Sequence, residues 1–363
     1  METVRLLSAQ RQERLLTELR GQGAVRVRDL AREFGVSELT IRRDIAALAE
    51  RGLVAKVHGG ATLPTHSTTL GRPRQAPLRF TIGMVVPSLD FYWPAVVAGA
   101  RAAAAALGVS IQLRGSSYDA DEDRRQMGRL VEAQQVQGLL LAPSLDGDDA
   151  DEILEWIGHL PVSTILVERQ PRRWTPATRH IEWVRSDHSL GLEIAIHHLR
   201  QQGHRRIGLV VAQGSPTSFH LRHAWRTAAA DPRTAGALAM QETVTTPGER
   251  DVIVRILREC RLSKITALIV HSDPHAIAVA QFCAEMGITV PGELAIVSYD
   301  DEIAHLADPA ITAVRPPKSH VGRLAVELML SRLLNGDRRP PHGVLLAPDL
   351  VVRESSLAPT QRH

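Results

Sequence analysis

The chain of 363 residues contains only two cysteines, and aromatic residues make up only 4% of it. Cys260 and Cys283 lie far apart and form no CxxC pair, so the sequence predicts reduced thiols and no disulfide framework. No segment approaches the roughly 18 uncharged apolar residues of a membrane span, and the first residues lack the apolar stretch of a signal peptide. These absences predict a cytoplasmic protein that does not insert into a membrane.

A strong excess of charge and the common enzyme motifs are missing as well. The formal net charge is +3 with 23% charged residues, which excludes a polyanion and a generally basic coat for nucleic acid. The chain contains no G-x-x-x-x-G-K-[ST] phosphate loop, no G-x-S-x-G nucleophile turn, no G-x-G-x-x-G after a strand and no H-E-x-x-H metal motif. We therefore expect no enzymatic activity, no cofactor and no metal, and any nucleic-acid binding must be local.

The length and the 44% hydrophobic content predict two or three globular units, of which the first is small and helical. Leu15, Leu16 and Leu19 recur at helical spacing within the segment 8–22. A short helix over 29–34 is expected to end at Gly35. The next helix follows after a turn of a few residues.

This next helix, for which Ser37 suits the N-cap, has a basic outer face. Its apolar residues recur at i, i+4 and i+7, in Ile41, Ile45 and Leu48. That stripe must face inward, which leaves Arg42 and Arg43 outside, as in a helix-turn-helix whose second helix enters the major groove of DNA. The segment 53–61 alternates apolar and polar residues before a glycine pair and predicts a β-wing. Each cation alone is more simply a solvated surface charge, whereas together they favour DNA binding.

Both segments resemble the DNA-binding domain of the DeoR family over about sixty residues. The resemblance is carried by Ser-x-x-Thr-Ile-Arg-Arg-Asp at 37–44 and by His-Gly-Gly-Ala at 58–61. It implies contacts with DNA from the recognition helix and the wing by Ser37, Thr40, Arg42, Arg43, Lys56 and His58. Lys56 departs from the family, which usually has an arginine there, and this departure concerns the wing contact alone.

The rest of the chain predicts an α/β fold. The segment 63–79 has several prolines and no apolar periodicity, as a linker does. Beyond it, apolar β-rich runs alternate with helical patterns, which is typical of parallel sheets covered by helices on both faces. The expected strands are 81–86, 109–113, 138–141, 162–167, 207–211, 267–270 and 294–299. We therefore expect a winged helix-turn-helix over 1–62, the linker, and two doubly wound lobes over 80–358 with a ligand in the cleft between them.

In such sheets, ligands bind at the loops that follow the carboxyl ends of strands. The first of these loops places Asp90 beside three aromatic residues at 91–93, and a ring with a carboxylate suits the apolar faces and hydroxyl edges of a sugar. Polar residues also follow later strands, namely Ser144, Glu168, Ser272 and Asp300. The alternative for each ring is the core of its lobe, and for an aspartate such as Asp273 it is the N-cap of the following helix.

The segment from about 80 to 356 resembles the sensor domain of LacI/GalR-type repressors and the ribose-binding proteins that share its fold. The resemblance is carried by residues 186–207, by Val-Ser-Tyr-Asp-Asp at 297–301 and by Val-Val-Arg-Glu-Ser at 351–355. It implies a periplasmic-binding-protein-like fold with three crossings between the lobes, one of them near 315–317, and dimerisation through this domain. Lobe 1 is expected over about 80–183 and 312–335, and lobe 2 over about 184–311 and 336–358.

The same resemblance places several residues at ligand positions: Asp90, Tyr92, Trp93 and Glu168 in the first lobe, and Ser272 and Asp300 in the second. The family usually has an effector-binding arginine three residues before a Gly-aromatic pair, but Leu221 stands there and Arg222 comes one residue late. Either the alignment shifts by one and Arg222 binds the ligand, or another group supplies the charge.

Together these features predict a DNA-binding transcriptional regulator, a repressor of carbohydrate-utilisation genes whose operator affinity is controlled by a sugar-like molecule. The expected partners are double-stranded operator DNA, the effector and further copies of the chain in a homodimer or a tetramer. The alternatives are a phosphorylated sugar or a non-sugar metabolite as effector, and a sugar-acting enzyme. Among the 16 histidines, two pairs have spacings that a metal could use, His271 with His275 and His220 with His223, although ordinary loop histidines are the simpler interpretation.

Overall fold

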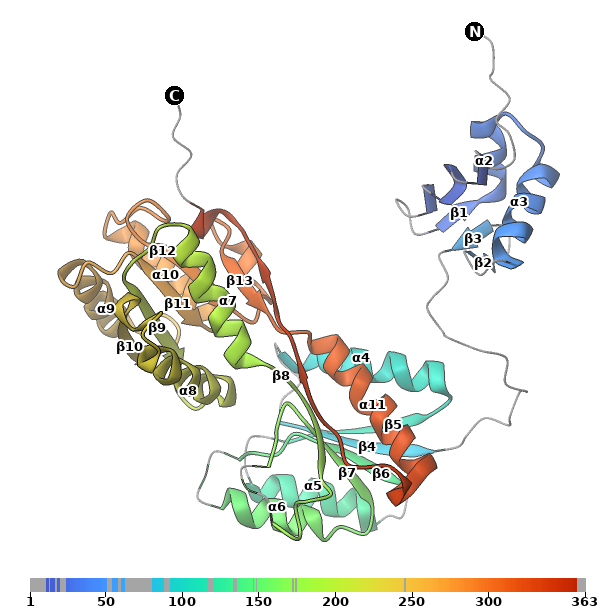
Figure 1. Cartoon of the computed structure of the whole chain (residues 1–363), viewed down its shortest axis with the longest axis horizontal. Helices are drawn as coiled ribbons and strands as arrows, with labels where there is room; N and C mark the ends of the chain where they lie inside the picture. The colour runs from blue at the N-terminus through green and yellow to red at the C-terminus, as the bar shows by residue number, and fades with distance from the viewer. Residues whose placement is uncertain are drawn as a thin grey trace. The chain divides into compact units, whose positions relative to one another are not determined.

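Figure 1 shows the computed structural model of the chain. It describes residues 11–12, 14–16, 18–19, 24–50, 54–57, 60–62, 80–87, 92–116, 120–132, 136–145, 147, 149–171, 173, 175–244 and 246–357. The chain divides into two compact units, Met1–Ala76 and Pro77–His363. The expected linker at 63–79 lies outside the described residues, as do His58 and Asp90.

The first unit contains the helix-turn-helix and the wing that the sequence predicts. Helical residues at 11–12, 14–16 and 18–19 come first, followed by β1 (Ala24–Arg26), α2 (Val27–Phe34), α3 (Glu38–Glu50), β2 (Ala55–Val57) and β3 (Gly60–Thr62). Gly35 has a positive φ of 65° in the turn between α2 and α3, a conformation that glycine adopts without strain. The strands pair antiparallel in the order β1-β3-β2, so β2 and β3 form the wing.

The second unit consists of two lobes, each built on a six-stranded sheet. In lobe 1 the strand order is β14-β8-β7-β6-β4-β5, with every pair parallel. The bounds are β4 (Thr81–Val86), β5 (Ser110–Gly115), β6 (Gly138–Leu141), β7 (Ser163–Val167), β8 (Glu182–Ser186) and β14 (Gly343–Leu346). The helices α4 (Tyr92–Leu107) and α11 (Lys318–Asn335) cover one face, and α5 (Ala120–Glu132) and α6 (Ala150–Gly158) cover the other (Figure 1).

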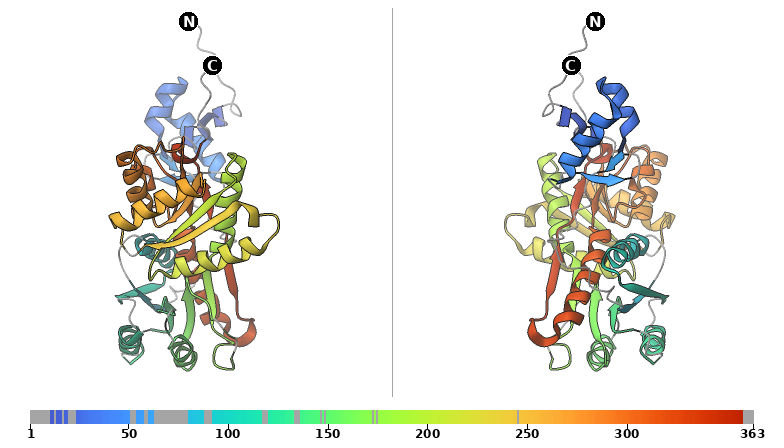
Figure 2. Two further views of the ribbon diagram at one scale, coloured as in Figure 1. Left: turned by 90° about the vertical axis from the view of Figure 1, so that its left-hand side faces the viewer. Right: turned by 90° about the vertical axis from the view of Figure 1, so that its right-hand side faces the viewer.

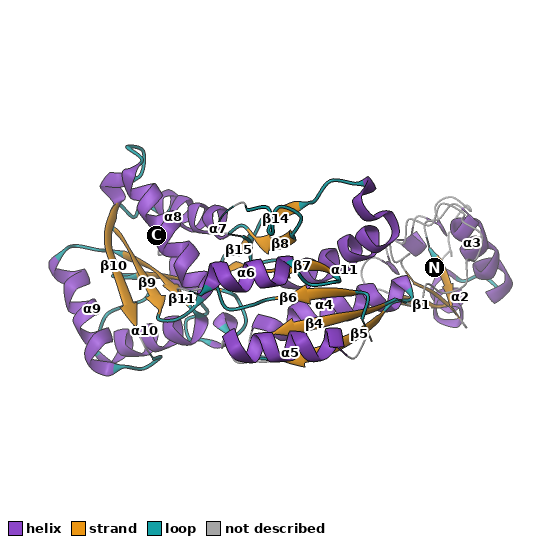
Figure 3. Ribbon diagram, turned by 90° about the horizontal axis from the view of Figure 1, so that it is seen from below, coloured by secondary structure: helices purple, strands orange, loops and turns teal. Residues whose placement is uncertain are grey.

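Lobe 2 repeats this plan with the strand order β10-β9-β11-β12-β13-β15. The bounds are β9 (Ile207–Ala212), β10 (Leu238–Val244), β11 (Ala267–His271), β12 (Ala295–Tyr299), β13 (Thr312–Arg315) and β15 (Asp349–Val351). Only the pairing of β13 with β15 is antiparallel in this sheet as described. One face is covered by α7 (His188–Gln201) and α8 (Pro216–Ala230), and the other by α9 (Arg250–Leu262) and α10 (Asp273–Glu285), as Figure 3 shows.

Short 3-10 turns and two thiols complete the second unit. The turns are η1 (Ala235–Ala237), η2 (Ala304–Leu306), η3 (Gly336–Arg338) and η4 (Glu354–Ser356). Cys260 and Cys283 are buried in lobe 2 as free thiols, as predicted, and burial raises the pKa of each to about 12. No helix in the described part of the chain is long and apolar enough to cross a membrane.

The chain passes between the lobes three times, as the resemblance implies, but the expected lobe boundaries need correction. Strand β13 had been expected in lobe 1, yet Thr312–Val314 pair with Val297–Tyr299 of β12 in lobe 2. Strand β14 had been expected in lobe 2, yet it pairs with β8 in lobe 1, and the two lie side by side (Figure 2). The chain therefore crosses between the lobes after β8, after β13 and after β14, because each of these strands is hydrogen-bonded within the sheet of the lobe that the chain then leaves.

Helices α4 and α11 pack closely because a glycine faces backbone on each of them. A Cβ atom on Gly99 would lie 1.9 Å from the carbonyl oxygen of Ser319, and one on Gly322 would lie 1.9 Å from that of Val96. No other residue fits at these distances. This packing places the start of α4, with Tyr92, against the start of α11, where Lys318 Nζ lies 5.2 Å from the Tyr92 ring centroid.

Candidate ligand site and nucleic-acid interface

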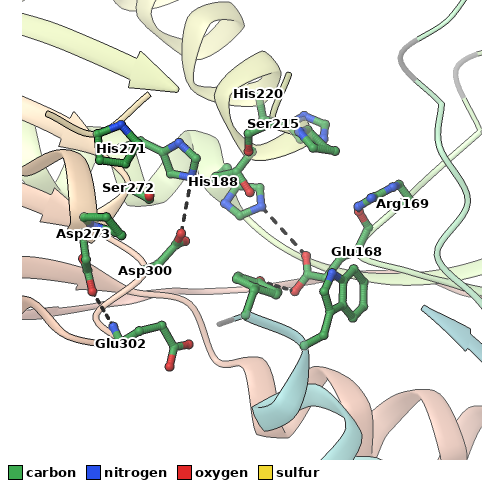
Figure 4. A pocket seen from close by; sticks show the side chains of 16 residues that line it. Glu168, Arg169, His188, Ser215, His220, His271, Ser272, Asp273, Asp300 and Glu302 are labelled. Carbon is green, nitrogen blue, oxygen red and sulfur yellow. Dashed lines mark hydrogen bonds and ion pairs between the residues drawn. The ribbon is translucent and has the colours of Figure 1, made fainter. Parts of the chain in front are cut away.

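A cavity of about 500 Å³ is lined by residues of both lobes (Figure 4). Most of the lining comes from residues at or just after the carboxyl ends of β7, β11 and β12 and from the first turns of α4 and α8. The lining residues are Tyr92, Trp93, Glu168, Arg169, His188, Ser215, Pro216, Thr217, His220, Pro247, His271, Ser272, Asp273, Pro274, Asp300 and Glu302. The cavity thus occupies the edge where α/β sheets bind ligands.

Glu168 is the buried carboxylate that lobe 1 contributes. It accepts hydrogen bonds from the Tyr92 hydroxyl (2.7 Å), the Ser186 hydroxyl (2.8 Å) and the Ser186 backbone N–H (2.9 Å). Burial raises the pKa of Glu168 above its ordinary value, and these three bonds only partly offset that rise. Burial also raises the pKa of Tyr92, with a further contribution from Glu168, so the phenol stays a hydrogen-bond donor.

Asp300 is the corresponding carboxylate of lobe 2. Its Oδ2 lies 3.3 Å from Nε2 of His271, whereas its Oδ1 is buried without a hydrogen-bond partner among the described residues. Burial acts to raise the pKa of Asp300, but His271 and Lys318 outweigh burial and the net shift is downward. Lys318 also donates to the backbone oxygen of Asp300 and pairs with Glu302. One oxygen of an ionised carboxylate is therefore left for a hydrogen-bond donor of a ligand.

Trp93 and Arg169 form the apolar and cationic wall of lobe 1. Trp93 is 3% exposed and belongs to the core of the lobe. It also lines the cavity, so this ring both packs in the core and faces the ligand site. The Arg169 guanidinium lies 5.9 Å from the Trp93 ring centroid and donates to the backbone oxygens of Pro143 and Glu168, each at 2.8 Å. Its Nη2 is buried without a partner among the described residues, so it can donate to a ligand.

Three histidines that the sequence did not predict as ligand residues line the lobe 2 wall: His188, His220 and His271. The rings of His188 and His220 stack with centroids 5.6 Å apart, and His188 Nδ1 lies 3.1 Å from the Tyr299 hydroxyl. Burial, with His220 adding to it, lowers the pKa of His188 well below its ordinary value, so His188 is neutral near pH 7. A neutral imidazole has one nitrogen that donates and one that accepts.

The predicted ligand residues divide into two groups. Tyr92, Trp93, Glu168, Ser272 and Asp300 line the cavity. Ser144 does not line it and instead donates its backbone N–H to Asp123 Oδ2 at 2.9 Å. Arg222 does not line it either, and Leu221 is fully buried in the core of lobe 2, so His220 occupies the part of α8 where an arginine had been expected.

Asp273 lines the cavity but is not the N-cap of the following helix. Ser272 is the N-cap of α10, in a capping box with His275, and Asp273 is the first residue of the helix. The Asp273 carboxylate accepts the Ser298 hydroxyl and the backbone N–H groups of Glu302 (2.6 Å), Ile303 (2.8 Å) and Ala304 (3.2 Å). It therefore holds the loop that carries Asp300.

The candidate nucleic-acid interface is the outer face of α3. Arg42 and Arg43 are exposed, and Leu39 is 59% exposed beside them. Ser37 caps the helix, because its hydroxyl accepts the backbone N–H of Thr40 at 3.2 Å and lies 2.9 Å from the Thr40 hydroxyl. Lys56 lies in β2, in the wing. The face combines cations for phosphates with hydroxyl and apolar groups for base edges.

A buried ion pair holds α3 in place. Arg11 Nε lies 2.5 Å from Asp44 Oδ2 and Arg11 Nη2 lies 3.2 Å from Asp44 Oδ1, and Asp44 is only 4% exposed. The aspartate of the Arg-Arg-Asp motif thus ties α3 to the first helix, while the arginines before it face outward.

Comparison with known families and proteins agrees with this architecture. Residues 11–67 match the DeoR-like helix-turn-helix domain, and residues 196–356 match the periplasmic binding protein-like domain. The chain is 23% identical over 342 residues to the arabinose metabolism transcriptional repressor of Geobacillus stearothermophilus, with 90% of each protein covered. It is 26% identical over 359 residues to the transcriptional repressor CytR of Escherichia coli, with 92% of this chain and 97% of CytR covered.

Solved structures of the same fold include transcriptional regulators. The transcriptional regulator CelR in complex with cellobiose superposes with a TM-score of 0.63 at 23% identity, over 94% of this chain and 98% of CelR. The lac repressor dimer bound to operator and the anti-inducer ONPF superposes with a TM-score of 0.65 at 23% identity, over 78% of this chain and 96% of the repressor chain. The chain therefore combines a DeoR-like helix-turn-helix domain with a periplasmic-binding-protein-like domain, and its relatives are transcriptional repressors of the LacI/GalR type.

Proposed function

We propose that this chain is a cytoplasmic transcriptional repressor of carbohydrate-utilisation genes, whose affinity for operator DNA changes when a free sugar binds between its two lobes. The observation that carries the proposal is the joint presence of an exposed basic recognition helix and a cavity to which both lobes contribute charged side chains. The relatives, which are repressors of arabinose and ribose genes among others, support the same function.

The chemistry of the cavity favours a neutral polyhydroxy ligand over a phosphorylated one. Glu168 and Asp300 contribute a carboxylate from each lobe, and Asp300 Oδ1 needs a hydrogen-bond donor. Sugar hydroxyls supply such donors, whereas a phosphate would be repelled by both carboxylates. Arg169 is the one arginine of the described lining, and part of its donor capacity is used by backbone oxygens.

A DNA-binding role also explains the charge pattern of the first unit. Arg42 and Arg43 would contact phosphates and Thr40 base edges in the major groove, with Lys56 and His58 contributing from the wing. We propose that two copies bind a two-fold symmetric operator as a homodimer, because a symmetric dimer reads two half-sites.

Two experiments test the two halves of this proposal. Selection of duplexes from a random DNA pool by the purified chain should yield a defined operator, and Arg43→Ala should weaken binding to it while leaving sugar affinity unchanged. A thermal-shift screen against free sugars and their phosphates should show stabilisation by a free sugar, since a ligand that binds only the folded state raises the melting temperature. Stabilisation by phosphorylated sugars alone would contradict the free-sugar assignment.

A further inference from the structure

Three side chains of lobe 2, two of which line the cavity, form a continuous chain of polar contacts. The Ser218 hydroxyl lies 2.9 Å from Nδ1 of His271, and Nε2 of His271 lies 3.3 Å from Oδ2 of Asp300 (Figure 4 shows the second contact). The three residues come from α8, the end of β11 and the loop after β12. The contacts therefore connect three elements of lobe 2 that each contribute to the cavity wall.

The order of these groups resembles a hydrolytic Ser-His-Asp triad, but the burial excludes a nucleophile. Ser218 is fully buried and does not line the cavity, whereas His271 and Asp300 do. A nucleophilic hydroxyl must reach the substrate, and the proton it loses must pass to the histidine nitrogen that faces it. Ser218 faces His271 but cannot reach a molecule in the cavity. Its hydroxyl can, however, determine which nitrogen of His271 carries the proton.

The proton positions follow from the acceptors. The Asp300 carboxylate can only accept, so Nε2 of His271 must carry the hydrogen that faces it. In a neutral imidazole Nδ1 is then the acceptor, and Ser218 must donate to it. The contact with His271 occupies Oδ2 of Asp300 and leaves Oδ1, which is buried and unpartnered among the described residues, as the acceptor for a ligand.

We propose that Ser218 and His271 are positioning residues for effector binding: Ser218 fixes the tautomer of His271, and His271 orients the Asp300 carboxylate toward a hydroxyl group of the effector. This inference rests on the proposed function, because it concerns the same cavity. It also explains how the site works although neither arginine of α8 lines the cavity. The helix contributes a buried serine behind the cavity and His220 within it, in place of a cation.

The first test needs no ligand. With ¹⁵N-labelled histidine in the full chain, the imidazole nitrogen shifts of His271, assigned through the His271→Gln variant, should report the tautomer protonated at Nε2. Ser218→Ala should remove the donor to Nδ1 and shift that nitrogen, whereas His223→Gln, an exposed substitution on α8, should leave the signals of His271 unchanged. Protonation at Nδ1 in the unaltered protein would overturn the inference.

The second test separates positioning from direct contact. Affinity is measured by calorimetry with the free sugar among D-ribose, L-arabinose and cellobiose that stabilises the chain most. His271→Leu should weaken binding about tenfold, the scale of one hydrogen bond to a charged group, while His271→Gln, which keeps a side-chain N–H near Nε2, should weaken it less. In an Asp300→Asn background, His271→Leu should cause little further loss, because its effect passes through Asp300.

Equal losses from His271→Leu in both backgrounds would overturn the inference, since His271 would then act on the sugar independently of Asp300. Operator binding and the melting temperature of each variant identify a misfolded protein. The tautomer measurement on the unaltered chain needs only one variant, His271→Gln, and only to assign the signals. If the chain selects an operator but binds no free sugar, the proposed effector class fails. The nitrogen shifts still decide whether Ser218 fixes the tautomer of His271.

Discussion

Replacing Asp273 should separate the effect of a hydrogen-bond acceptor from that of a charge. The carboxylate is 1% exposed and accepts the backbone N–H groups of Glu302, Ile303 and Ala304 together with the Ser298 hydroxyl. Alanine would leave four donors without their partner, each costing about 1–3 kcal/mol when buried. Because the four share one acceptor group and are not additive, we expect Asp273→Ala to lower the free energy of unfolding by about 3–5 kcal/mol.

Asp273→Asn should cost only about 1–2 kcal/mol. The amide oxygen can still accept the backbone N–H groups, and the amide nitrogen can donate to Ser298. Burial raises the pKa of Asp273, which indicates that the site disfavours the charge itself. Urea denaturation at pH 7 measures both variants, and calorimetry measures their sugar affinity, which Ala should reduce because the Asp300 loop loses its anchor. Equal destabilisation by Asn and Ala would refute this reasoning.

Three further predictions concern pH, the cavity boundary and packing. Burial, with His271 adding to it, lowers the pKa of His275 to about 4, so the unfolded chain binds the proton first and stability is lost as the pH falls from about 6.5 toward 4. Between pH 7 and 5 the free energy of unfolding, measured by urea titration, should fall by about 2 kcal/mol. The variant His275→Gln, which preserves a capping box with Ser272, should show a smaller loss over the same pH range. Arg222→Ala should leave sugar affinity unchanged in calorimetry, whereas a tenfold loss would place Arg222 at the ligand after all. Gly322→Ala should lower the free energy of unfolding by about 2–4 kcal/mol, because its Cβ would overlap the Val96 carbonyl, and a neutral result would contradict this close packing.

The fold could be predicted because its signals are local. Apolar runs identified seven strands whose ends match β4, β5, β6, β7, β9, β11 and β12 within about two residues. The recognition helix followed from the stripe of Ile41, Ile45 and Leu48, which is buried. What could not be predicted is the exchange of β13 and β14 between the lobes. Short strands of four residues carry no sign of the sheet to which they belong, since that depends on pairing partners far along the chain.

The candidate site was predictable wherever a polar residue directly follows a strand. Glu168, Ser272 and Asp300 line the cavity for this reason. His220 could not be found in this way, because it lies in a helix and only the direction of its side chain brings it to the cavity. Ser144 met the same sequence criterion as Glu168 but does not line the cavity. A position after a strand indicates the right edge of the sheet and does not specify where the side chain points.

The central claim is that a ligand between the lobes controls the affinity for DNA. The most direct test measures operator affinity by fluorescence anisotropy with and without the stabilising sugar, and sugar affinity with and without operator. The account predicts that each ligand changes the affinity for the other by the same factor, between about 5- and 150-fold, and that Asp300→Asn greatly reduces the response of operator affinity to a given sugar concentration. A sugar that binds the cavity and leaves operator affinity unchanged would contradict it.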